Sequence, residues 1–207
     1  SKSTALGYFA LSVQNFTSAT DVFNVAVGHV AGTAITTGVQ NTLIGSFAGD
    51  ALTDADFNVA MGVAALGADT LGSHSVAIGT YALAAQNFTS ATNSYNVAVG
   101  SSAGTSITTG TGHTLIGGLA GDSLTTGLGN TAVGTNALGG ETTGRYNVAI
   151  GENALKDQNF TGSNNVYNVA VGRMAGESVT TGIQNTLIGG LSGDAITDAD
   201  RNVALGY

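Results

Sequence analysis

The stretch "NVAVG" occupies residues 24–28, and close variants of it recur along the whole chain of 207 residues. The next copies are "NTLIG" at 41–45, "NVAMG" at 58–62 and "SVAIG" at 75–79. The signature glycines at positions 28, 45, 62, 79 and 100 mark three 17-residue units followed by a 21-residue unit. The same order starts again at position 100 and defines a 72-residue super-repeat. Such regular self-similarity indicates stacked structural repeats.

The length and composition of the unit favour β-structure. A 17-residue unit is too short for paired-helix repeats, and the 32 glycines would weaken helices by roughly 1 kcal/mol per site. In Val25, Ala26 and Val27 the two valines share one face and the alanine points the other way, as in a strand. We therefore predict an all-β parallel β-solenoid of 17-residue coils, with a 21-residue coil at every fourth position.

The residues after the signature glycine indicate one narrow core. Four residues on, the chain has Gly in some units, such as Gly32, and Leu in others, such as Leu66. After Gly, an aliphatic residue such as Ile35 follows three residues later. After Leu, that later site is polar: Asp69, Gln86, Glu141 or Gln158. One aliphatic side chain thus fills the core from either of two positions, as close packing requires.

The repeat extends over the whole chain, which predicts a single continuous solenoid over residues 1–207. Its super-repeats span about 8–79, 80–151 and 152–207, the last one partial. The sequence begins and ends within ordinary repeats, so we expect a solenoid without capping coils at either end. Twelve signatures at about 4.8 Å per coil predict a rod on the order of 55 Å long.

Asparagine opens most copies of the signature. Stacked at the coil spacing, these side chains can form an amide ladder along the axis, and each can also act as a turn former. The two interpretations are compatible. The predicted ladder comprises Asn24, Asn41, Asn58, Asn96, Asn130, Asn147, Asn168, Asn185 and Asn202.

The units "NTLIGSFAGDALTDADF" at 41–57 and "NTAVGTNALGGETTGRY" at 130–146 resemble repeats of tail-fibre-like proteins of phages and bacteria. More distantly, "SVAIGTYALA" at 75–84 is similar to the head repeats of trimeric autotransporter adhesins, which form parallel β-rolls. The resemblance covers essentially the whole chain. It implies an extracellular segment of a fibre on a cell surface or a virion.

Composition excludes several function classes. The net charge is −8 with only five Lys and Arg, so we expect no nucleic-acid partner. No apolar run approaches the roughly 20 residues of a membrane span, and we expect no membrane insertion. The three histidines, His29, His74 and His113, occupy different places in their units, so stacking does not align them into a catalytic group. We expect neither an enzyme nor a cofactor.

Two further sets of side chains are candidate ligand sites. The repeated "GDALTDAD"-type segments place Asp50, Asp54, Asp56, Asp194, Asp198 and Asp200 as a calcium candidate, with a solvated turn as the alternative. Aromatic residues precede several signatures, including Phe57 and Tyr95. They could form a sugar-stacking patch or pack over a corner of the core.

The 21-residue coils owe their extra length to a heptapeptide, "QNFTSAT" at 14–20 and 86–92 and "QNFTGSN" at 158–164. It contains Asn-Phe-Thr, an acceptor sequence for N-linked glycans in an exposed loop. Asn15, Asn87 and Asn159 are the candidate attachment sites, and a turn without a glycan is the alternative. We predict that Phe16, Phe88 and Phe160 anchor these loops against the solenoid wall.

The sequence thus favours a structural subunit or shaft of an extracellular fibre, on a cell or virion surface. Its expected partner is itself, end to end or as a homotrimer, and covalent glycans would coat it. The alternative is an adhesin or receptor-binding fibre that recognises surface glycans. That function would require one loop position to vary on a fixed scaffold, whereas the inserted loops are nearly identical.

Overall fold

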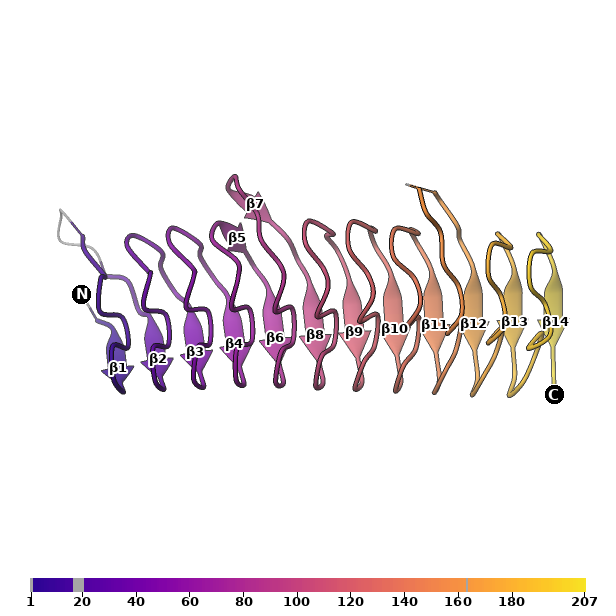
Figure 1. Cartoon of the computed structure of the whole chain (residues 1–207), viewed down its shortest axis with the longest axis horizontal. Helices are drawn as coiled ribbons and strands as arrows, with labels where there is room; N and C mark the ends of the chain where they lie inside the picture. Colours follow the sequence, from indigo (N-terminus) through magenta and orange to yellow (C-terminus); the bar gives the residue numbers. More distant parts are fainter. Residues whose placement is uncertain (1, 17–20, 163) are drawn as a thin grey trace.

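The computed structural model describes residues 2–16, 21–162 and 164–207. Within these ranges the chain is all-β, and twelve short strands form one parallel sheet in sequence order (Figure 1). The strands are β1 (Thr4–Leu6), β2 (Val25–Val27), β3 (Thr42–Ile44), β4 (Val59–Met61), β6 (Val76–Ile78), β8 (Val97–Val99), β9 (Thr114–Ile116), β10 (Thr131–Val133), β11 (Val148–Ile150), β12 (Val169–Val171), β13 (Thr186–Ile188) and β14 (Val203–Leu205). In the part of the chain that is described, no helix could cross a membrane.

Each strand consists of the middle three residues of one signature copy, and neighbouring strands pair in register. Val25 pairs with Thr42 and Ala26 with Leu43, so β2 and β3 are related by one 17-residue coil. The pairing of β1 with β2 joins Thr4 to Val25 and spans one of the longer, 21-residue coils. The predicted parallel β-solenoid is therefore confirmed, including its mixture of coil lengths.

The core is a narrow column inside the coils. The middle residue of each strand points inward, so Ala26 and Leu43 are fully buried. A Cβ on Gly32 would lie 2.7 Å from Leu43 Cδ1 and 3.2 Å from Ile35 Cδ1, which leaves no room for a larger residue. Where the later site is polar, Leu66 fills the same column from the earlier position. This packing explains the exchange seen in the sequence.

The signature glycine allows the coils to stack at a sharp corner. Gly45 has a φ of 132°, a conformation that L side chains rarely adopt. A Cβ there would also lie 2.5 Å from the carbonyl oxygen of Gly62 in the next coil. Both the dihedral angle and the close approach of the stacked backbones therefore require glycine.

A second, two-stranded sheet forms where the heptapeptide is inserted. β5 (Gly72–Ser73) pairs in parallel with β7 (Thr92–Asn93), the returning limb of the second loop. At the third loop, Arg145 and Asn165 form an isolated bridge at the same place in the super-repeat. Figure 1 shows these two loops projecting beyond the other coils on one side of the rod.

Candidate functional site: the inserted loops and the polar network beneath them

The loops present their asparagines to solvent. Asn15, Asn87 and Asn159 are all exposed. A threonine of the preceding coil holds each of the two later side chains: Thr70 Oγ1 donates to Asn87 Oδ1 at 3.0 Å, and Thr142 Oγ1 donates to Asn159 Oδ1 at 2.9 Å. These contacts use the amide oxygen, whereas a glycan would be attached to the amide nitrogen. Whether glycans are attached stays a prediction, and residues 17–20 of the first loop lie outside the described residues.

The phenylalanine beside each asparagine points the other way. Phe88 and Phe160 are only 5% and 7% exposed, and Phe16 is half-buried. The Phe88 ring packs beside Gly72, where an added Cβ would lie 2.8 Å from Phe88 Cδ2. Adjacent Asn and Phe side chains in a loop thus separate into an outward and an inward position.

A buried carboxylate fastens the second loop. Asp69 is fully buried, and its Oδ1 accepts the backbone N–H groups of Gly72 at 3.0 Å and Phe88 at 3.1 Å. Its Oδ2 accepts Gln86 Nε2 at 2.6 Å. Gln86 in turn accepts Asn96 Nδ2 at 2.8 Å, which joins the loop to the asparagine column. These bonds connect the Asp69 carboxylate both to the inserted loop and to the turn of its own coil.

The third loop repeats the arrangement with a longer acid. Glu141 is fully buried, and its Oε1 accepts the backbone N–H groups of Gly144 at 2.7 Å and Phe160 at 3.2 Å. Its Oε2 accepts Gln158 Nε2 at 2.7 Å, and Gln158 accepts Asn168 Nδ2 at 2.8 Å. We call each Asp/Glu–Gln pair a loop clamp.

Sequence reasoning missed the loop clamps as a site. The sequence indicated only that, in these coils, the aliphatic core residue stands three positions before the polar one. The signal that could have found them is their place in the repeat: in both super-repeats the acid lies in the coil before the loop and the glutamine opens the loop itself. Since buried carboxylates need several donors, a polar pair in a core column should have pointed to a hydrogen-bonded network.

The asparagine column is buried and hydrogen-bonded along most of its length. Asn41 Nδ2 donates to the carbonyl of Ala55 at 2.8 Å, which closes its own coil. Asn41 Oδ1 accepts the backbone N–H of Asn58 at 2.9 Å, which joins the next coil. Direct amide-to-amide contacts are fewer, for example 3.1 Å from Asn147 Nδ2 to Asn130 Oδ1. The column therefore combines the turn and ladder roles.

His113 takes the place of an asparagine in this column. Its Nε2 lies 2.9 Å from the carbonyl oxygen of Gly127, and its Nδ1 accepts the backbone N–H of Asn130 at 3.2 Å. The neutral imidazole with its proton on Nε2 reproduces the donor and acceptor of an asparagine amide. Burial lowers the pKa of His113 to about 4. The side chain is a structural substitute rather than a general base.

The acidic residues are not brought together. Among the described residues, no group of three His, Cys, Asp or Glu side chains could hold a metal ion. Asp54 Oδ1 accepts the hydroxyl groups of Thr36 and Thr37, and these bonds lower its pKa. Asp56 Oδ1 accepts a backbone N–H at 2.8 Å. The geometry offers these two carboxylates as hydrogen-bond acceptors between neighbouring coils rather than as calcium ligands. Their equivalents in the last super-repeat are exposed: Asp194, Asp198 and Asp200.

The aromatic residues before the signatures stack on one another along the axis. The Phe57 and His74 rings lie 4.9 Å apart, and the His74 and Tyr95 rings 5.3 Å apart, nearly parallel in both cases. Tyr146 and Tyr167 form a similar stack at 5.4 Å. Phe57 and Tyr95 remain 45% and 60% exposed, so these rings form an exposed aromatic strip along the rod and are not part of the core.

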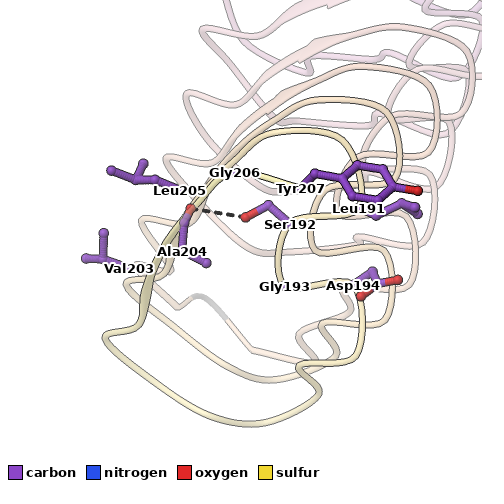
Figure 2. A pocket seen from close by; sticks show the side chains of 9 residues that line it. All are labelled: Leu191, Ser192, Gly193, Asp194, Val203, Ala204, Leu205, Gly206 and Tyr207. Atoms are coloured by element: carbon purple, nitrogen blue, oxygen red, sulfur yellow. Dashed lines mark hydrogen bonds between the residues drawn. The ribbon is translucent and has the colours of Figure 1, made fainter.

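The hollow at the carboxyl end of the rod is the exposed end of the core. It has a volume of about 590 Å³ and is lined by residues 191–194 and 203–207 (Figure 2). Ser192 Oγ donates to the carbonyl oxygen of Ala204 at 3.0 Å across it. In the preceding coil the equivalents of Ser192 and Ala204, Ala175 and Leu187, are fully buried, so the hollow opens onto the core column.

Comparisons with protein-family models, with curated proteins and with solved structures find no match.

Proposed function

We propose that this chain is a non-enzymatic shaft segment of an extracellular fibre, on a cell or virion surface. The observation that carries the proposal is the continuous, in-register pairing of twelve strands, each of which contacts only its axial neighbours. Such a solenoid has one long axis and can be lengthened by adding coils without changing any existing contact. The extracellular location rests on the resemblance to fibre repeats and on the three acceptor sequences.

The first and last strands each have one edge without a partner strand among the described residues. All three residues of β1 are exposed, and so are Val203 and Leu205 of β14. Unpaired strand edges are templates for a further strand. A further coil, from the same polypeptide or from another copy, would pair with these edges and fill the hollow beside Ser192 and Ala204.

The inserted loops support a decorated shaft. They recur every fourth coil, so at about 4.8 Å per coil they form a row with a spacing of about 19 Å. Exposed Asn87 and Asn159 lie in this row, and glycans there would keep a surface poor in charge from aggregating laterally. Intact mass spectrometry of the native protein tests this part: a mass equal to that of the bare polypeptide would reject the glycan coat.

Recognition of surface glycans is a second candidate function, favoured by one observation. A hollow of about 300 Å³ beside the third loop is lined by Phe160, Asn164, Asn165, Thr181, Ile183 and Asp200. A glycan array probed with the purified chain tests it, and Asp200→Ala should abolish any signal that arises from this hollow.

Electron microscopy and fibre diffraction of the native assembly test the shaft itself. We expect filaments with a meridional spacing of about 4.8 Å and a weaker one of about 19 Å. Dispersed particles of one chain at all concentrations, without growth at their ends, would contradict axial assembly.

A further inference from the structure

Tyr146 and Tyr167 form the only stack of two phenol rings within the part of the chain that the structure describes. Their ring centroids lie 5.4 Å apart, and their planes differ by 13°. The other ring contacts of the described residues pair tyrosine with histidine or phenylalanine, or histidine with phenylalanine. Two phenols in contact are the arrangement that oxidative coupling of tyrosine requires.

The backbone holds the two tyrosines at one corner of consecutive coils. Each stands two positions before a paired strand residue, since Val148 of β11 pairs with Val169 of β12. Their φ angles are 62° and 56°, a left-handed conformation that is uncommon for bulky residues. Consecutive coils lie about 4.8 Å apart, so rotation about side-chain bonds alone brings the two ring edges together.

Both rings are open to a reagent in solution. Tyr146 is 41% exposed and Tyr167 is 47% exposed. The chain has no cysteine and no tryptophan, which are side chains that compete with tyrosine for an oxidant. An oxidant that reaches this corner therefore meets the paired phenols.

The pair lies across the coil that carries the third inserted loop, residues 158–164. The equivalent pair at the second loop is His74 and Tyr95, whose rings are stacked at 5.3 Å. At the first loop Lys2 Nζ lies 5.5 Å from the centre of the Phe23 ring. A side-chain contact across the inserted coil thus recurs in each super-repeat, whereas two phenols meet only at the third loop.

We propose that Tyr146 and Tyr167 are a site of oxidative cross-linking, at which a peroxide-dependent oxidant joins the two rings as dityrosine. Each phenol loses one electron and its hydroxyl proton to the oxidant. The two radicals form a bond between the ring carbons next to their oxygens, and the hydrogens on these carbons move to the oxygens. The two electrons and two protons reduce one hydrogen peroxide molecule to two water molecules.

The new bond closes a covalent ring around the third loop. Such a bond restricts the opening of a chain segment, which is the role that disulfides have in other proteins. The chain has no cysteine with which to form one. This inference does not depend on the proposed fibre function, because both tyrosines belong to one chain.

Peptide mapping after oxidation tests the proposal. The purified chain is treated at low concentration with hydrogen peroxide and a haem peroxidase, then unfolded and digested with trypsin. Trypsin cuts after Arg145, Lys156 and Arg173, so the two tyrosines fall in peptides 146–156 and 157–173. These peptides should appear as one species that is lighter than their sum by two hydrogen atoms, with dityrosine fluorescence. The undigested product should keep the 20.3 kDa mass of one chain.

Phenylalanine variants provide matched controls, because they keep the ring and remove only the hydroxyl group. Tyr146→Phe and Tyr167→Phe should each abolish the linked peptide. Tyr95→Phe, which removes a phenol stacked on His74, should leave its yield unchanged. Oxidation in concentrated urea should lower the yield at least about tenfold, because unfolding removes the proximity of the two rings.

Three results would overturn the proposal. The first is a digest of the oxidised chain without the linked peptide. The second is coupling mainly through other tyrosines, and the third is an equal yield of the linked peptide in urea.

Discussion

Replacing His113 by asparagine should remove a specific pH dependence from the stability of the rod. His113 is 1% exposed and occupies an asparagine position between Asn96 and Asn130. Since asparagine serves this position in most other coils, His113→Asn should leave the free energy of unfolding within about 1 kcal/mol of wild type at neutral pH.

The two proteins should diverge in acid. The pKa of the imidazole is ordinarily 6.5 and falls to about 4 in the fold, because burial disfavours the charged form. As the pH falls below 6.5, the unfolded chain binds a proton that the folded chain does not, so stability present above pH 6.5 is lost between pH 6.5 and about 4. At about 1.4 kcal/mol per pKa unit, the complete loss is about 3 kcal/mol.

Urea unfolding followed by circular dichroism, at several pH values from neutral down to about 4, measures this difference. His113→Asn should become more stable than wild type by about 3 kcal/mol at the acid end. The control, His29→Asn, changes an exposed histidine and should follow wild type. A difference between wild type and His113→Asn that stays constant over this pH range would refute the assigned role of the imidazole.

Three other perturbations test the coil and its loops. Asp69→Ala should leave the Phe88 amide and other buried donors unpaired and lower the free energy of unfolding by on the order of 3 kcal/mol. Hydrogen exchange at the Phe88 amide should become faster, and unchanged exchange would count against the loop clamp. Phe88→Ala should cost about 3 kcal/mol locally and make the second loop sensitive to proteolysis; continued resistance would argue against anchoring. Gly45→Ala should prevent stable stacking, whereas Gly190→Ala, with nothing within 4 Å of its added Cβ, should be tolerated; equal melting temperatures would contradict the packing described for the corner.

The 17-residue period is sufficient to predict the coil and the place of the strand within it. A hydrophobic pattern of period two within a strict 17-residue unit predicts parallel stacking of the coils. In that arrangement each core residue lies above the equivalent residue of the next coil, so the core column is continuous. One coil has Gly32 and Ile35 where another has Leu66 and Asp69. This exchange can be recognised in the sequence because a narrow core holds a constant side-chain volume. The inserted loops can also be located in the sequence, because each one interrupts the fixed 17-residue period.

The roles of the polar residues depend on contacts between coils, which the repeat pattern does not contain. Whether Asp69 faces water or three donors depends on a loop in the next coil, and no local pattern encodes that contact. The letters give His113 no role, and it becomes an asparagine substitute only when Gly127 and Asn130 surround it. Likewise, the exposure of Ile116 could not be distinguished from core burial, because both faces of these strands carry aliphatic residues. Burial and hydrogen-bond partners are properties of the stacked coils, and a single coil does not contain them.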